Sequence, residues 1–217
     1  MTTHATSILG RMDTTTVSDA LDKLGIPGQC LGIKPLDPRF RLCGPAFTIR
    51  YVPCGIHGGT VGDYIDDLPE GTVVALDNQA RMDATVWGDI LTTVASRRKL
   101  GGTVIDGVCR DAPRSIELKY PIFARGSYMR TGKDRVAVDA VQCSISVGGV
   151  RINPGDFLLG DWDGVIAVPK ERIEQVAEVA EQIERAEDRI RAAVERGERL
   201  DTARKNQGYH SLQTRPA

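Results

Sequence analysis

Asp89, Arg110 and Asp111 are the residues of this chain whose types and spacing best suit chemistry. Twenty residues separate Asp89 from Arg110, and Asp111 follows directly. The intervening residues read as one helix and one strand, so the two ends of the segment can meet in space. Two carboxylates and a guanidinium at one place could hold a divalent metal and an anionic substrate, which is the outline of a lyase site.

The elements around this motif form a predicted β-α-β unit. Residues 71–77 are apolar and β-branched and predict a buried strand, and residues 103–106 predict a second one. Residues 88–99 have a helical pattern with cations in the last turn, and Gly101-Gly102 ends it. Ligands gather beyond the carboxyl ends of strands in such units. We therefore expect the Arg-Asp pair just past a strand end and Asp89 near the helix start.

The first turn of that helix offers a second kind of binding group. Its free backbone N–H groups, at Ile90 and Leu91, could bind a substrate carboxylate. The residues alone leave an ordinary interpretation open as well. An Asp near a helix start is a common cap, and an Arg-Asp pair after a strand is a common surface ion pair.

Composition narrows the class of protein. The chain has 217 residues, most simply one domain, and its 28 basic and 29 acidic residues nearly balance. This balance argues against a broad nucleic-acid interface. There is neither a run of eighteen apolar residues nor an apolar signal core, and the five cysteines include no CxxC. We expect a cytoplasmic protein with reduced thiols, no membrane partner and no nucleic-acid partner.

The residue types available in this chain favour a mechanism that uses carboxylates. The three histidines are His4, His57 and His210, and two of them lie near the termini. They make neither a convincing zinc site nor a supported Ser or Cys mechanism, and Cys109 beside the motif reads as a core thiol. Mg²⁺ or Mn²⁺ suits the remaining groups, because one or two carboxylates, waters and the substrate suffice for such an ion.

The rest of the pattern predicts a mixed α/β layout. A polar loop is expected at 78–83. Strands are expected at 46–52, 71–77, 103–107, 121–124, 135–139, 143–147, 149–152, 157–160 and 164–168. Helices are expected at 16–24, 61–67, 88–99, 112–118 and 170–196.

Four segments resemble one known superfamily. The D-x20-R-D motif resembles that of the 4-hydroxy-4-methyl-2-oxoglutarate (HMG) aldolases, whose superfamily also contains the RraA regulators of ribonuclease E. TTTVSDALDKLG at 14–25 is similar to the opening helix of that family, and CGPAFTIRYVPC at 43–54 to its first core strand. VGGVRINPGDFLLGDWDGVIAVP at 147–169 is similar to its closing hairpin and strand. The resemblance covers about residues 12–200.

The resemblance implies a fold and a set of roles. The fold is the swivelling β/β/α domain, here an α/β RraA-like catalytic domain over 1–205 with a long C-terminal helix at 170–196 and a flexible tail at 206–217. Asp89 and Asp111 would hold the metal, mostly through waters, and Arg110 would contact the 2-oxo acid. The chain departs from the family at residues 78–81, where relatives often carry glycines. Asn78 and Arg81 are therefore candidate contacts for the distal half of the substrate.

The C-terminal helix supplies a further acid. Its apolar stripe is predicted at Ile173, Val176, Ala180, Ile183, Ile190 and Val194, and Glu187 falls on that stripe. Glu187 could snorkel to water or pair with Arg191. In the HMG aldolases a Glu on this helix reaches the metal site of the neighbouring subunit, which implies this role for Glu187, or else Glu184. Asp19 falls near another acid that the aldolases present across a subunit boundary, although it also suits a polar helix surface.

The expected function is metal-dependent cleavage of an HMG-type 4-hydroxy-2-oxo acid to pyruvate, with oxaloacetate decarboxylation at the same site. The expected assembly is a homotrimer or hexamer with shared active sites. The opposing hypothesis is an RraA-like regulator that binds and inhibits ribonuclease E. Regulators of that type resemble shorter chains without the long helix, so the helix favours the enzyme. No cofactor fingerprint supports a third possibility, a menaquinone methyltransferase.

Overall fold

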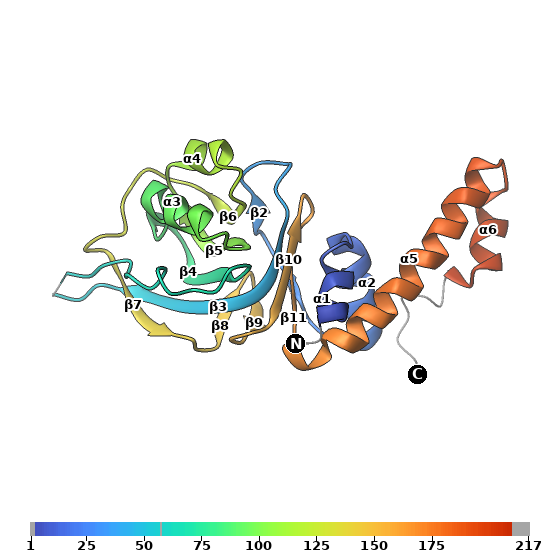
Figure 1. Cartoon of the computed structure of the whole chain (residues 1–217), viewed down its shortest axis with the longest axis horizontal. Helices are drawn as coiled ribbons and strands as arrows, with labels where there is room; N and C mark the ends of the chain where they lie inside the picture. Colours follow the sequence, from blue (N-terminus) through green and yellow to red (C-terminus); the bar gives the residue numbers. More distant parts are fainter. Residues whose placement is uncertain (1–2, 57, 210–217) are drawn as a thin grey trace.

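A mixed sheet organises the chain (Figure 1). The structure is a computed structural model that describes residues 3–56 and 58–209. In the described residues the sheet has nine strands. Eight of them follow the order β1-β11-β10-β3-β4-β5-β6-β2, and the ninth, β7, pairs with β3. Strands β8 and β9 form a separate hairpin. The strands are β1 (Gln29–Cys30), β2 (Lys34–Pro35), β3 (Leu42–Pro53), β4 (Val73–Thr85), β5 (Gly102–Cys109), β6 (Ile122–Ser127), β7 (Val136–Val141), β8 (Ile145–Val147), β9 (Val150–Ile152), β10 (Phe157–Asp161) and β11 (Gly164–Val168).

Helices lie on both sides of the sheet. They are α1 (Thr3–Leu9), α2 (Thr14–Leu24), α3 (Asp89–Arg97), α4 (Ala112–Glu117), the 3-10 turn η1 (Lys170–Arg172), α5 (Ile173–Glu195) and α6 (Leu200–Asn206). In Figure 1, α3 and α4 cover one face of the β3–β6 region, and the β8–β9 hairpin lies on the other face. Helices α1 and α2 lie between β10–β11 and α5. The predicted mixed α/β fold with a long C-terminal helix is confirmed.

The β-α-β unit that carries the motif is present as predicted. Strand β4 pairs in parallel with β5, and β5 pairs in parallel with β6. Every residue of β5 is buried, which fits its mostly apolar sequence. The buried carboxylate of β5, Asp106, pairs with Arg125. Because α3 connects β4 to β5 and α4 connects β5 to β6, the starts of both helices lie at the carboxyl edge of the parallel strands.

The C-terminal helix begins with the η1 turn and then continues as α5. Its first half packs against α1 and α2 in one core cluster, and its last turns pack against α6. The predicted apolar stripe is confirmed from Ile173 to Ile183 and at Ile190, but it was wrong at Glu187 and Val194. The buried positions in the second half of α5 are Ala186, Ile190 and Ala193, while Val194 is 41% exposed and Glu187 is half-buried. After Ile183 the steps run three, four, three, so small alanines take the inner face.

Three other predictions were wrong or incomplete. Residues 61–67 are not helical, because Gly62 adopts a left-handed backbone and Ile65 and Leu68 enter the core as loop residues. Residues 78–83 are not a loop but part of β4, whose pairing with β5 is interrupted on both sides of Arg81. The pattern also missed α1, α6, β1 and β2, which are short and take their stability from packing.

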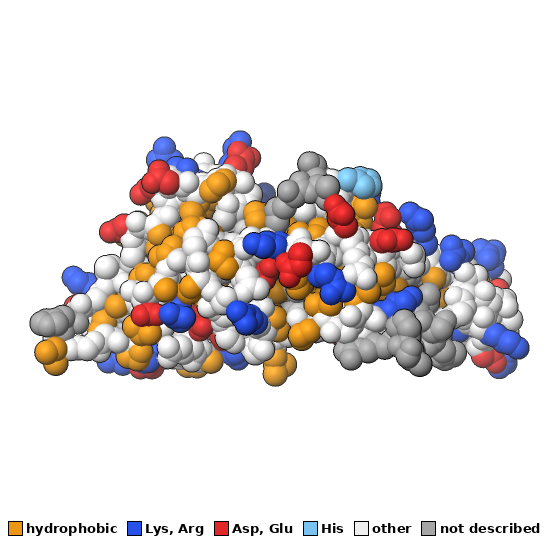
Figure 2. All heavy atoms as spheres, turned by 90° about the horizontal axis from the view of Figure 1, so that it is seen from below, with side chains coloured by type: hydrophobic (Ala, Val, Ile, Leu, Met, Phe, Trp, Pro, Cys, Tyr) orange, Lys and Arg blue, Asp and Glu red, His pale blue; other side chains and the backbone are white. Residues whose placement is uncertain are grey.

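The surface charge is mixed. On the face shown in Figure 2, acidic and basic side chains alternate and no broad patch of one sign stands out. This agrees with 28 basic and 29 acidic residues in the whole chain. No helix among the described residues is long and apolar enough to cross a membrane.

Candidate active site

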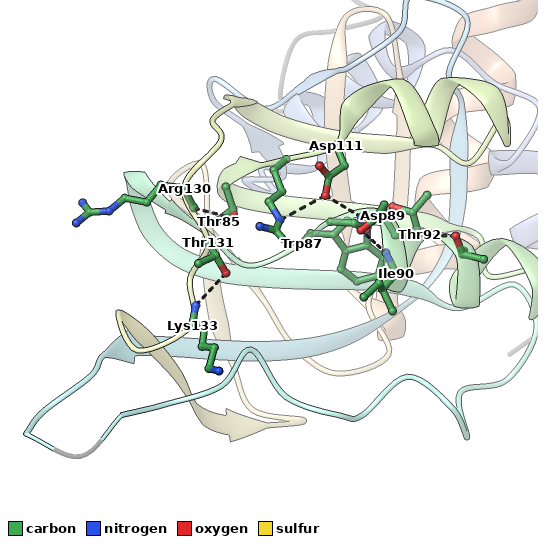
Figure 3. A network of polar contacts seen from close by, with 12 residues as sticks. Thr85, Trp87, Asp89, Ile90, Thr92, Asp111, Arg130, Thr131 and Lys133 are labelled. Atoms are coloured by element: carbon green, nitrogen blue, oxygen red, sulfur yellow. Dashed lines mark hydrogen bonds and ion pairs between the residues drawn. The ribbon is translucent and has the colours of Figure 1, made fainter.

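The two ends of the predicted motif meet where β5 ends and α3 begins (Figure 3). The backbone N–H of Asp89 donates to Oδ2 of Asp111 at 3.2 Å. The Nε of Arg110 lies 3.3 Å from the same oxygen, and both side chains are 40% exposed. A guanidinium and two carboxyl-bearing residues therefore share one solvent-open edge.

The N-cap of α3 is Gly88 and not Asp89, and Asp111 does not cap the helix that follows it. This residue occupies the N-cap position of α4 with a left-handed backbone, φ 57°, yet its side chain makes no capping hydrogen bond. Its carboxylate points instead toward the start of α3. A non-glycine residue in this conformation carries a modest conformational cost, and such costs concentrate at functional sites.

The Asp89 carboxylate accepts a hydrogen bond from the first turn of α3. The N–H of Ile90 donates to Oδ1 of Asp89 at 2.9 Å, so one of the two predicted substrate donors is engaged in this state. Ile90 is 73% exposed and Leu91 is half-buried. Both residues border the cavity described below, as expected.

Gly88 allows the close approach of Arg110 and Asp111. A Cβ at this position would lie 2.9 Å from Oδ2 of Asp111 and 3.2 Å from Nε of Arg110. A side chain would therefore push both groups away from α3. The pattern analysis assigned no role to Gly88, because the contact joins residues that are more than twenty positions apart.

A buried hydrogen-bond chain fixes the start of α3. The indole N–H of Trp87 donates to Oγ1 of Thr92 at 2.9 Å, and this hydroxyl donates to the carbonyl of Gly88 at 2.8 Å. The carbonyl of Trp87 accepts the N–H of Arg110 at 3.1 Å. The backbone on both sides of the motif is thus held by one aromatic residue.

A cavity of about 190 Å³ opens beside the motif. It has walls from α3, from the end of β4 and from two distant loops. One loop is anchored by Thr85, whose N–H and hydroxyl both donate to the carbonyl of Arg130 at 3.1 Å. The lining residues are Val61, Gly62, Asp63, Thr85, Val86, Trp87, Gly88, Asp89, Ile90, Leu91, Arg110 and Thr131.

A larger cavity lies elsewhere but lacks the motif. It measures about 380 Å³, lies among α2, β1 and β11, and is lined in part by Ser18, Asp19 and Lys34. The predicted acid Asp19 therefore lies on a wall that is separate from the Asp89–Arg110–Asp111 site. We place the chemistry in the smaller cavity, because it combines a guanidinium with carboxylates.

The structure does not bring the other proposed substrate contacts to this cavity. Asn78 is 1% exposed, and its amide donates to the carbonyl of Ala84 at 3.0 Å. Arg81 pairs with Asp83 at 3.3 Å. Neither lines the 190 Å³ cavity. Their local role in this chain is to stabilise the irregular end of β4.

Glu187 is also remote from the motif within one chain. It pairs with Arg191 at 3.3 Å on α5, which projects from the side of the molecule opposite to α3 (Figure 1). Glu184 lies on the same helix. In the described part of the chain, no group of three His, Cys, Asp or Glu side chains is close enough to hold a metal.

The donor set fits a hard divalent cation held largely through water. Asp89 and Asp111 provide carboxylate oxygens at a solvent-open edge, and the described cavity lining contains neither His nor Cys. One or two carboxylates with several retained waters are typical of Mg²⁺, and Mn²⁺ accepts the same oxygen ligands. The set does not fit a zinc site.

Neither Cys109, beside the motif, nor the more distant Cys30 supplies a nucleophile. Cys109, at the end of β5, is fully buried, and burial raises the pKa of its thiol to about 12. Burial likewise raises the pKa of Cys30 to about 12. Both thiols are therefore protonated and unreactive at neutral pH. His57 and His210 lie outside the described residues.

Comparison with known proteins shows the family of the chain. Residues 14–167 match the model of the RraA-like family, described as Aldolase/RraA. The chain belongs to the RraA-like family. A "Putative 4-hydroxy-4-methyl-2-oxoglutarate aldolase" of Halalkalibacterium halodurans is 34% identical over 82% of this RraA-like chain and 82% of its own length. Protein DlpA of Legionella pneumophila is 41% identical over 89% of the chain, which spans about a third (32%) of DlpA.

Solved structures extend the likeness to nearly the whole RraA-like chain. An uncharacterized protein from Pseudomonas syringae pv. tomato has a TM-score of 0.88 at 39% identity, covering 94% of this chain and 98% of that one. RraAS2 of Streptomyces coelicolor, described as an unusual member of the RNase ES inhibitor RraA protein family, has a TM-score of 0.80 at 26% identity. That match covers 86% of this chain and 96% of RraAS2.

Proposed function

We propose that this chain is a divalent-metal-dependent lyase. It cleaves a 4-hydroxy-2-oxo di- or tricarboxylic acid of the HMG type by a retro-aldol reaction that releases pyruvate, and it decarboxylates oxaloacetate as a side activity. The observation that carries the proposal is the meeting of Asp89, Arg110 and Asp111 beside one open cavity, which Asp89 and Arg110 line. The aldolase name of a relative at 34% identity supports the same reaction class.

The carboxylates and the guanidinium have separate roles in this proposal. Asp89 and Asp111 would hold Mg²⁺ or Mn²⁺, which when bound supplies Lewis-acid charge next to the oxygens of the 2-oxo acid. Arg110 places a fixed positive charge where the enolate charge of pyruvate grows. Its side chain is oriented by Asp111 and its backbone by the carbonyl of Trp87, so it needs little rearrangement during the reaction.

The first turn of α3 completes the binding of the substrate. Leu91 presents its N–H near the helix start, and within the described chain this group makes no hydrogen bond. A substrate carboxylate there benefits from the N-terminal end of the helix dipole. The N–H of Ile90 becomes available if Asp89 turns toward a metal.

We also propose that the active site is shared between subunits of a trimer or hexamer. One described chain provides only two of the three carboxylates that the resemblance implies. Helix α5 projects away from the sheet and carries Glu187 with it (Figure 1). The apolar stripe of α5 is covered by α1, α2 and α6 of the same chain, so the stripe does not require a neighbouring subunit. The proposal of a shared site is supported by the projecting helix and by the family resemblance.

Pyruvate release from a panel of substrates tests the reaction. The panel contains HMG, other 4-hydroxy-2-oxo diacids, oxaloacetate and a 2-oxo acid without the hydroxyl, all with Mg²⁺ present. We expect pyruvate from the hydroxylated diacids and from oxaloacetate, detected with lactate dehydrogenase and NADH. Absence of pyruvate from every diacid would contradict a pyruvate lyase.

A regulator of a ribonuclease is the second candidate, and the likeness to RraAS2 favours it. Such a protein would lower the rate of RNA cleavage by ribonuclease E without any dependence on Arg110. Measuring that rate with the wild-type chain and with Arg110→Ala separates this candidate from the lyase.

A further inference from the structure

Asp63 lies on the wall of the same cavity, on the loop between β3 and β4. With Asp89 and Arg110 it makes up the set of ionisable side chains among the described lining residues. The proposed function assigns no role to it. It comes from a segment more than twenty residues away from the motif and is held by a different part of the fold.

The loop holds Asp63 in place through Val61, two residues before it, and Tyr64, directly after it. The hydroxyl of Tyr51 donates to the carbonyl of Val61 at 2.8 Å, and Tyr64 packs against Phe47 with ring centroids 6.2 Å apart. The residues on both sides of Asp63 are thus tied to β3. Asp63 itself is exposed and makes neither a hydrogen bond nor an ion pair with any described residue.

The other polar groups of the cavity are poorly suited to accept a proton. Arg110 has no acceptor atom. Oδ1 of Asp89 accepts the N–H of Ile90, and this residue is assigned to the metal. The hydroxyl of Thr85 donates to the carbonyl of Arg130, and hydroxyls are weak bases in any case. Asp63 is the remaining carboxylate with both oxygens available.

From this placement we infer that Asp63 is the general base of the proposed aldol cleavage. The inference rests on the proposed function. The Asp63 carboxylate takes the proton of the 4-hydroxyl, the O–H electron pair forms the new carbonyl, and the C3–C4 bond breaks with its pair entering the pyruvate enolate. Asp63 then returns the proton to C3 of the enolate. The proton moves from oxygen to carbon and no co-reactant is needed.

The two proposed activities differ in their need for this base. Oxaloacetate already carries an ionised carboxylate, so loss of CO₂ requires no proton removal before the bond breaks, and the resulting enolate takes its proton at C3 from water. Both reactions still need stabilisation of the same enolate by Arg110. A base acting on the hydroxyl therefore affects aldol cleavage selectively, whereas a group that only binds or orients the 2-oxo acid affects both activities.

The test compares Asp63→Asn with the wild type on HMG and on oxaloacetate, with Mg²⁺ present. We expect kcat for HMG cleavage to fall by about 100-fold or more, the usual contribution of a general base, and oxaloacetate decarboxylation to stay within a few-fold. Asp63→Glu keeps the carboxylate and should recover part of the HMG activity. Asp66→Asn, an exposed acid of the same loop outside the cavity lining, should change neither reaction.

Equal effects of Asp63→Asn on both reactions, or no effect on either, would overturn the inference. Far-UV circular dichroism of each variant shows whether a loss of both activities is a loss of fold, and the Asp63→Glu kinetics then decide. A variant Asp63→Glu with wild-type decarboxylation but no HMG cleavage beyond Asp63→Asn would also overturn it. A wild-type protein that cleaves no hydroxylated diacid would instead remove the proposed function on which the inference rests.

Discussion

Replacing Asp111 or Arg110 with alanine is expected to lower kcat/KM for pyruvate release by more than about 100-fold, comparable to the loss of one oxyanion stabiliser. Asp111→Ala would remove a proposed metal ligand and the ion-pair partner of Arg110. Arg110→Ala would remove the positive charge that is proposed to stabilise the enolate. The folded state should persist, because both side chains are 40% exposed and exposed ion pairs contribute little to stability.

Two matched variants sharpen this experiment. Arg110→Lys keeps the charge but loses the planar fork, so its kcat/KM should stay well below that of the wild type. Arg130→Ala removes a guanidinium near the cavity that is not among its lining residues, and it should have a small effect. Near wild-type kinetics in well-folded Asp111→Ala or Arg110→Ala would reduce the motif to a surface ion pair.

Subunit mixing is expected to restore activity from two inactive variants. If Glu187 reaches the metal site of a neighbour, Glu187→Ala and Asp111→Ala should each be inactive alone. After dissociation and joint reassembly at equal amounts, about one quarter of the sites should receive both wild-type residues, because each interface draws its two chains at random. The measurement is pyruvate release before and after mixing, with the size of the assembly followed by light scattering.

Controls for this experiment come from the same helix. Asp188→Ala removes the other carboxylate that contacts Arg191 and should leave activity unchanged. Glu184→Ala, tested in parallel, shows whether the neighbouring acid on α5 is the one that acts. An active monomer, or properly mixed oligomers without recovered activity, would contradict the shared site.

The part of the site that the sequence could predict is the part built by one β-α-β unit. Asp89 and Asp111 meet because β4 and β5 run parallel and both helices start at the same edge. This arrangement follows from local patterns: two apolar strands and one amphipathic helix. The predicted Gly-Gly stop was wrong, because α3 ends at Arg97, Lys99 takes the left-handed conformation and Gly102 begins β5. The same reasoning also placed Ile90 and Leu91 on the cavity.

The remaining walls of the cavity have no local signal. Asp63 and Thr131 are brought to the motif by loops whose courses depend on contacts far along the chain, such as the bond from Tyr51 to Val61. Residues 61–67 were predicted to be a helix, yet Gly62 is left-handed and the segment packs as a loop. The spacing of apolar residues also placed Glu187 on the buried face of α5, where the structure has Ala186. Steps of three and four residues fit two neighbouring faces of a helix equally well, so the spacing could not distinguish them.

The most direct test of the central proposal is pyruvate release from HMG by the wild-type chain before and after exhaustive chelation. The carboxylate donor set predicts that EDTA followed by desalting abolishes release, and that Mg²⁺ or Mn²⁺ restores it while Ca²⁺, which prefers larger and more flexible oxygen sites, restores less. Circular dichroism should be unchanged by chelation. Undiminished pyruvate release from the fully chelated protein would contradict a metal-dependent lyase.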